Sequence, residues 1–71
     1  MPDARERLLW MLYKDDEIAE AAMRLVPGDG IELLLRQKGV LVESLVYSDP
    51  SEAGRIAKVK WDEMLAQGWT E

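Results

Sequence analysis

The sequence predicts a small α+β domain, because two strand-like apolar segments around a glycine turn lie between two segments of helical character. Residues 31–47 are rich in aliphatic residues and are divided by a Lys-Gly pair, which is typical of a hairpin. Residues 50–67 begin and end with helix signals. Residues 3–26 place apolar side chains at helical spacing. We therefore expect one α-β-β-α domain over residues 1–71.

The first segment begins with Asp3 as an N-cap and Glu6 three residues later, which is the pattern of a capping box. Apolar residues then recur every three or four positions: Leu8, Met11, Ile18, Ala22 and Leu25. Asp15 interrupts this stripe, so it marks either the exposed side of one bent helix or a break between two helices. We expect one helix over about residues 3–26, which ends at a Pro-Gly-Asp-Gly turn.

The hairpin over residues 31–47 has two possible registers. A two-residue loop at Lys38 and Gly39 pairs Gln37 with Val40. The side chains of positions 31, 33 and 35 then share a face with these residues: Val40, Val42 and Val46. A three-residue loop shifts the pairing by one position. The same side chains then share a face with a different set: Leu41, Leu45 and Tyr47.

The last segment carries the most complete set of helix signals in the chain. Asp49 is an N-cap, Pro50 stands at the first helical position, and Glu52 follows three residues after the cap. Gly68 suits the left-handed position that ends a helix, and Trp69 can then fold back onto Met64. We expect a helix over about residues 50–67 with one apolar stripe: Ala53, Ile56, Ala57, Trp61, Met64 and Leu65.

Association with another chain is the support we expect for so small a domain. The chain contains no cysteine and no histidine, so disulfides and the commonest structural metal sites are excluded. Because 48% of the residues are apolar and a two-stranded hairpin leaves its edges unpaired, we expect a homodimer or one protein partner. The candidate interaction residues are the hairpin's large apolar residues and three aromatic residues outside it: Leu34, Leu41, Leu45, Tyr47, Trp10, Tyr13 and Trp69.

The charge of the chain argues against nucleic-acid binding. There are 14 acidic and 9 basic residues, for a formal charge of -5, whereas phosphate binding requires clustered Lys and Arg. Four carboxylates gather in the first segment: Asp15, Asp16, Glu17 and Glu20. This cluster is either a solvated face or a mimic of nucleic acid that blocks a basic protein. It lacks the alternating ligands and central glycine of a calcium loop, so we expect no metal.

The segment EIAEAA followed by IELLLRQKGVLVE resembles a winged helix-turn-helix. The resemblance covers about half the chain and implies a DNA-binding transcription regulator, with residues 31–38 forming the reading helix. Short apolar runs do not distinguish a helix from a strand. The negative charge and the Pro-Gly-Asp-Gly turn oppose this interpretation, and Arg36 and Lys38 are the only basic residues in the segment.

We expect no enzymatic activity and no cofactor, because the chain offers no His or Cys for proton transfer or nucleophilic attack, and its serines lack a nucleophile context. The start of the sequence lacks the features of a secretory signal, and its longest uncharged apolar stretch, residues 8–13, is too short to cross a bilayer. We therefore expect a cytoplasmic interaction module that self-associates through the hairpin.

Overall fold

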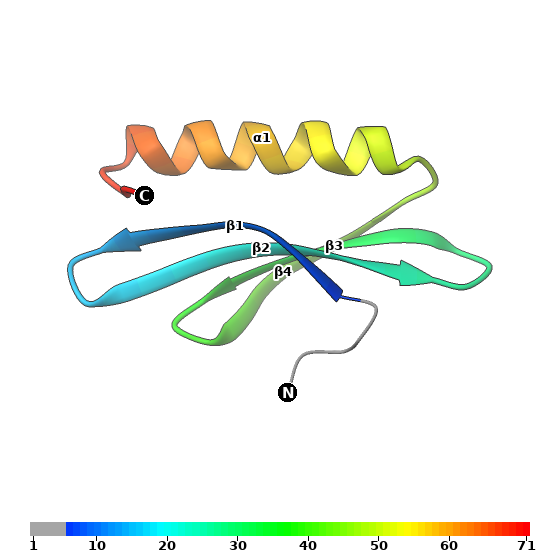
Figure 1. Cartoon of the computed structure of the whole chain (residues 1–71), viewed down its shortest axis with the longest axis horizontal. Helices are drawn as coiled ribbons and strands as arrows, with labels where there is room; N and C mark the ends of the chain where they lie inside the picture. Colours follow the sequence, from blue (N-terminus) through cyan, green and yellow to red (C-terminus); the bar gives the residue numbers. More distant parts are fainter. Residues whose placement is uncertain (1–5) are drawn as a thin grey trace.

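The computed structural model describes residues 6–71 and folds them as four β-strands followed by one α-helix (Figure 1). The elements are β1 (Glu6–Lys14), β2 (Glu17–Val26), β3 (Gly30–Gln37), β4 (Val40–Tyr47) and α1 (Pro50–Ala66). Each strand pairs antiparallel with the next, in the order β1-β2-β3-β4. The α-β-β-α order expected from the sequence is therefore wrong. The predicted cap Asp3 lies outside the described residues.

A hairpin of β1 and β2 replaces the expected N-terminal helix. Lys14 pairs with Glu17 across a two-residue turn, in which Asp15 has a φ of 55°. The helical spacing misled because both faces of these strands carry apolar residues, as with Leu12 on one face and Met11 on the other. Their alternation is then hidden, and apolar residues fall three or four apart by coincidence. Asp15, which interrupts the apolar stripe, forms this turn together with Asp16.

The β3–β4 hairpin occupies the predicted residues, and its two-residue loop is confirmed. Gln37 pairs with Val40, and positive φ angles of 55° at Lys38 and 76° at Gly39 match the turn that suits hairpin twist. Leu41 still pairs with Arg36, but a β-bulge then leaves Val42 without a partner and shifts the register.

The bulge decides which side chains share a face. Beyond it, Leu33 lies opposite Leu45, and Ile31 lies opposite Tyr47. This grouping is the one that the three-residue loop would have produced. The register of the two-residue loop is therefore right next to the loop, and the register of the three-residue loop is right beyond the bulge, because a bulge changes the register within a strand.

The predicted C-terminal helix is confirmed to within a residue at its end. The Asp49 side chain accepts a hydrogen bond from the backbone N–H of Ser51 at 2.9 Å, and Pro50 begins the helix. Gly68 has a φ of 100°, and the Trp69 N–H donates to the Met64 carbonyl at 3.1 Å. These contacts satisfy backbone groups that a helix leaves unpaired at its ends.

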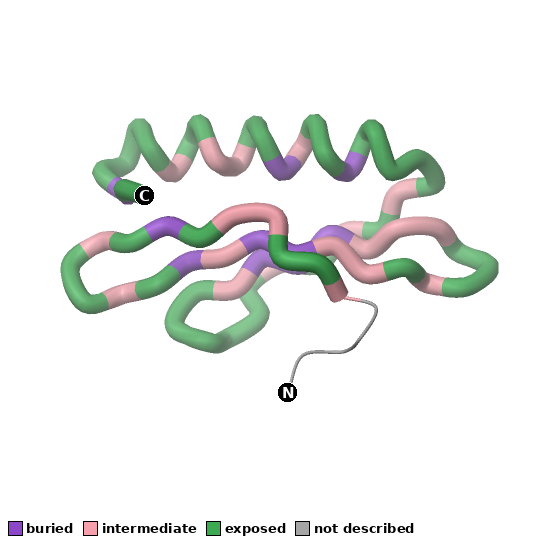
Figure 2. Tube along the Cα trace, in the orientation of Figure 1, coloured by how far each residue is buried: buried purple, intermediate pink, exposed green. Residues whose placement is uncertain are grey.

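The core lies between α1 and one face of the sheet, where the buried positions of both layers meet (Figure 2). Leu12 and Ala19 pack with Trp69, which follows the helix and is 6% exposed. Trp10 and Trp61 meet edge to face with ring centroids 5.9 Å apart. The Trp10 indole N–H donates to the Ala57 carbonyl at 3.0 Å, so its polar atom is satisfied.

Only one face of the sheet is covered by α1 (Figure 1). Side chains alternate along a strand, so the neighbours of the helix-facing residues point the other way. We call this second surface the open face. Leu34 and Ala22 lie at its centre and are buried, whereas Leu8 at its edge is 53% exposed. The expected N-terminal helix does not cover this face, because residues 6–26 extend the sheet as β1 and β2 instead.

Gly30 and Gly54 form a matched pair for a stability test. A Cβ on Gly30 would collide with the Tyr47 carbonyl oxygen, and its φ of 116° strains any L side chain. A Cβ on Gly54 in α1 meets nothing within 4 Å. Gly30→Ala should therefore lower the free energy of unfolding, while Gly54→Ala should raise it by about 0.5–1 kcal/mol. Urea denaturation measures both, and equal effects would contradict the close approach at Gly30.

Leu33 and Leu65 test the position of the core. Leu33 is fully buried under α1, so Leu33→Ala should reduce the free energy of unfolding by about 2–5 kcal/mol. Leu65 was expected on the buried stripe of the helix but is 39% exposed, so Leu65→Ala should cost about 1 kcal/mol or less. A larger loss at Leu65 than at Leu33 in urea denaturation would contradict this packing.

Candidate functional site

The two edges of the sheet differ in how they are covered. Tyr13 near the end of β1 exchanges two backbone hydrogen bonds with Thr70, at 2.7 and 2.8 Å, so the C-terminal residues extend along this edge. Within residues 6–71, no segment pairs with the outer edge of β4. Its outward N–H and C=O groups form a template on which another strand can pair.

Exposed aliphatic side chains gather along this open edge. We call them the β4 strip: Val40, Leu41, Val42 and Val46, which are 62%, 51%, 55% and 54% exposed. Native edge strands are commonly protected by lysine, proline or charged residues. Here the single charged residue of β4 is Glu43, and its carboxylate lies 3.4 Å from the Lys60 ammonium on α1. The strip therefore combines unpaired backbone with apolar side chains.

The open face carries ion pairs between its strands. Arg36 on β3 lies 2.6 Å from the Glu6 carboxylate on β1 and 3.6 Å from that of Glu20 on β2. Arg24 pairs with Glu32 in a second group. These ion pairs place charged side chains near the centre of the open face. Its margin holds exposed apolar side chains: Leu8, Met11, Tyr13, Ile18, Leu41 and Val46.

Glu32 is the carboxyl group of the open face whose titration is perturbed. The Ser44 hydroxyl donates to its Oε2 at 2.9 Å and lowers its pKa. Burial opposes this by raising the pKa, and Arg24 lowers it again through a hydrogen bond and its charge. The net pKa lies below the usual range, so this carboxylate is held ionised between β2, β3 and β4.

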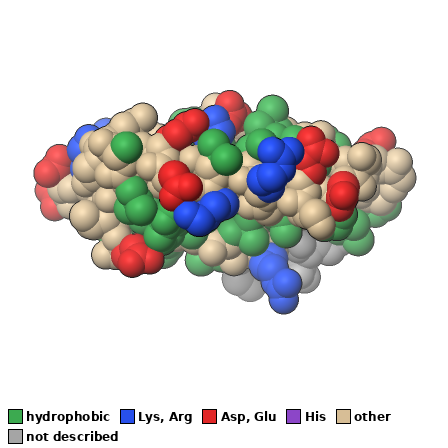
Figure 3. Space-filling model, turned by 90° about the horizontal axis from the view of Figure 1, so that it is seen from above, with side chains coloured by type: hydrophobic (Ala, Val, Ile, Leu, Met, Phe, Trp, Pro, Cys, Tyr) green, Lys and Arg blue, Asp and Glu red, His purple; other side chains and the backbone are tan. Residues whose placement is uncertain are grey.

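The four acidic candidates do not form one free patch. Glu17 pairs with Lys38 at 2.7 Å, which raises the pKa of that lysine by hydrogen bonding and by charge. Glu20 pairs with Arg36 on the open face. Asp15 and Asp16 remain at the β1–β2 turn. Seen from above α1, acidic, basic and apolar side chains are intermixed (Figure 3).

The hairpin candidates lie on the two opposite faces of the sheet. Leu41 and Leu34 lie on the open face, where Leu41 belongs to the exposed β4 strip and Leu34 is 3% exposed at the centre. Leu45 and Tyr47 lie half-buried on the face toward α1, opposite Leu33 and Ile31. A partner at the β4 edge would touch Leu41 directly, whereas substitution of Leu45 would first disturb the packing under α1.

The aromatic candidates are also divided. Trp69 is buried in the core, and Trp10 is half-buried beside Trp61. Tyr13 is 42% exposed, and its hydroxyl lies 3.3 Å from the sulfur of Met11 on the open face. Of the three, Tyr13 offers the most accessible ring to another molecule.

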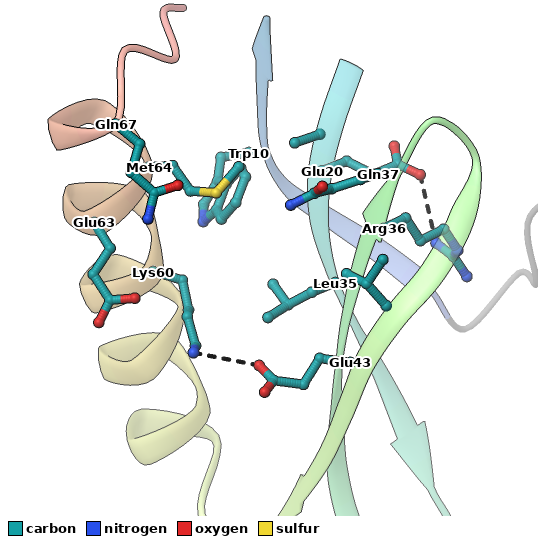
Figure 4. A pocket seen from close by; sticks show the side chains of 12 residues that line it. Trp10, Glu20, Leu35, Arg36, Gln37, Glu43, Lys60, Glu63, Met64 and Gln67 are labelled. Atoms are coloured by element: carbon teal, nitrogen blue, oxygen red, sulfur yellow. Dashed lines mark ion pairs between the residues drawn. The ribbon is translucent and has the colours of Figure 1, made fainter. Parts of the chain in front are cut away.

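A pocket of about 280 Å³ opens between α1 and the sheet (Figure 4). Trp10, Leu35 and Met64 form apolar parts of its wall, and the Lys60–Glu43 pair bridges the helix and β4 beside it. Its size is at the lower limit for small-molecule sites, which usually measure about 300–1,000 Å³. The residues that line it include no serine, threonine or tyrosine to act as a nucleophile.

Sequence reasoning missed three members of the β4 strip: Val40, Val42 and Val46. They lie on the predicted strand, so their apolar character was visible. Their exposure was not, because it depends on β2 pairing with β3 and leaving β4 at the edge. The bulge at Val42 also has no glycine to signal it, because Val42 does not have the positive φ that some bulges require.

Residues 6–71 contain no group of three or more acidic side chains placed to hold a metal ion. In the same part of the chain, no helix is long and apolar enough to span a membrane. The structure defines a small β-β-β-β-α domain with an exposed edge strand, β4. No family model, curated protein or solved structure matches this chain, so its function has to be argued from its own geometry.

The pH dependence of stability tests the Glu32 site. Since its pKa is lowered in the folded state, Glu32 contributes stability above its unfolded pKa, and this contribution is lost as the pH falls through the folded pKa. Ser44→Ala should raise the pKa of Glu32 and weaken this acid dependence. Ser48→Ala is the control, because Ser48 is not among the groups that shift this pKa. NMR titration of the carboxyl carbon measures the change, and an unshifted pKa in Ser44→Ala would exclude the hydrogen bond.

Proposed function

We propose that this chain is a non-enzymatic protein–protein interaction module that self-associates through the β3–β4 hairpin. The observation that carries this proposal is the β4 strip, in which four exposed aliphatic side chains accompany an unpaired strand edge. Exposed apolar patches on small domains commonly mark interaction sites.

The small size of the domain and its thin core also support association. A chain of 71 residues buries only about 60% of the surface of its unfolded state, and small scaffolds often gain stability from oligomerisation. Its core is thin, because α1 supplies only Ala53 and Ala57 as fully buried helix residues. Burying the β4 strip against another chain would add apolar contact that the single copy lacks.

The two other functions considered from the sequence receive less support. An acidic mimic of nucleic acid needs concentrated, unpaired carboxylates, but Glu17 and Glu20 are paired with basic side chains. A winged helix-turn-helix needs a reading helix at residues 31–38, and these residues form most of strand β3.

The solution mass tests self-association directly. Light scattering coupled to size exclusion, over about a hundredfold range of concentration, should show a mass that rises toward twice 8.1 kDa. A mass that stays at one copy throughout would exclude self-association.

A matched pair of lysine substitutions locates the surface. Leu41→Lys places a charge in the β4 strip, so it should shift the midpoint of dimer formation to at least about tenfold higher concentration. Val59→Lys on the exposed side of α1, where Val59 is 43% exposed, should leave the midpoint unchanged. Circular dichroism verifies that both variants fold. Equal midpoints for the two variants would place the interface elsewhere.

A further inference from the structure

We propose that self-association joins β4 of one copy to β4 of a second copy in antiparallel, two-fold pairing centred on Ser44. Two four-stranded sheets would then form one continuous eight-stranded sheet. This inference rests on the proposed self-association and adds its geometry. An antiparallel strand edge is complementary to a second copy of itself, which is what a two-fold interface requires.

The ion pairs of the open face favour pairing at the edge over stacking of two sheets. Stacking would bury Arg36 with Glu6 and Glu20, together with the Arg24–Glu32 pair. Removing charged groups from water costs several kcal/mol per ion before their attraction is counted. Pairing at the edge of β4 leaves all of these groups at a solvent-facing surface while it covers aliphatic side chains.

The state of the two edges favours β4 over β1. Thr70 already pairs with Tyr13 and extends along part of the β1 edge. A second copy at that edge would have to displace these hydrogen bonds. At β4 no segment of residues 6–71 needs to move, so the backbone hydrogen bonds formed by pairing are a net gain.

The side chains of β4 distinguish the possible centres of the two-fold pairing. A pair centred on Glu43 brings two carboxylates face to face, and like charges in that position are destabilising. A pair centred on Leu45 places Val46 opposite Ser44. A pair centred on Ser44 places Glu43 opposite Leu45 in both halves, so it separates the two Glu43 carboxylates, and the regular pairing ends before the bulge at Val42. This register keeps like charges apart and lets the two Ser44 hydroxyls face each other.

The two-fold axis of such a pair is perpendicular to the sheet, so both α1 helices lie on the same side. The two open faces then become one continuous surface on the other side. The Lys60–Glu43 ion pair of each copy lies on the helix side of the joined strands and remains intact.

Single-cysteine variants test this geometry, because the chain has no cysteine of its own. In the proposed register the two Ser44 Cα atoms lie about 4.5–5.5 Å apart, which is within the range of a disulfide. The two Leu41 Cα atoms lie about 20 Å apart, because each is three residues from the axis. After mild oxidation, Ser44→Cys should form at least about tenfold more disulfide dimer than Leu41→Cys or the helix control Ser51→Cys.

A measurement on the unchanged protein keeps the test decisive if Ser44→Cys disturbs the fold. Amide hydrogen exchange in the middle of β4 should slow at least about tenfold as the concentration is raised through the midpoint of dimer formation, because pairing gives the outward N–H groups of this edge a partner. The amides of β1 are the control, and equal slowing in both strands would contradict pairing at β4.

The outcomes separate this inference from the proposed function. If light scattering shows a dimer but neither the cysteine test nor hydrogen exchange gives the expected result, self-association stands and the β4 pairing is overturned. Stacked sheets would give this result, because their backbones lie about 10 Å apart, beyond the reach of a disulfide. If light scattering shows a monomer and oxidation gives no preferred disulfide, both are overturned.

Discussion

One helix has to cover a four-stranded sheet, and it can cover only one of its two faces. The contact between α1 and the sheet depends on Trp10, whose ring packs against Trp61 and whose indole N–H bonds to the Ala57 carbonyl. Ala53 and Ala57 allow the helix to approach closely, and Trp69 closes the end of the core. The open face and the β4 edge are therefore not covered by α1.

The open face is protected by a mixture of small residues and ion pairs. Ala22 and Leu34 are buried at its centre, although α1 lies on the opposite side of the sheet (Figure 1). The long side chains of Arg36 and Arg24 bury their hydrocarbon stems along such a surface while they keep their charges paired. Within residues 6–71 the β4 edge has no comparable protection, and this contrast within one sheet supports the proposal that another chain pairs there.

The helix and the second hairpin were predictable because their signals are local. Asp49, Pro50 and Gly68 act on backbone groups within a few residues, and Gly39 permits the tight turn of the hairpin. The first hairpin was missed because strands with two apolar faces have no clear period, and the alanine-rich segment also suits a helix. Its strand conformation is stabilised by the pairing of β2 with β3 and by the contacts of Trp10 with Ala57 and Trp61, which lie far along the chain in α1.

For the β4 edge as well, local residue types were predictable and contacts between strands were not. From its residues alone, β4 is apolar and lacks lysine and proline, and neither a disulfide nor a histidine metal site can support the domain. The three-dimensional arrangement was needed to see that β4 is an edge strand, that Leu45 and Tyr47 face the helix, and that Glu17 and Glu20 are paired. The physical reason is that exposure and ion pairing depend on which strands become neighbours, and neighbours in a sheet are chosen by hydrogen bonding and packing across the whole chain.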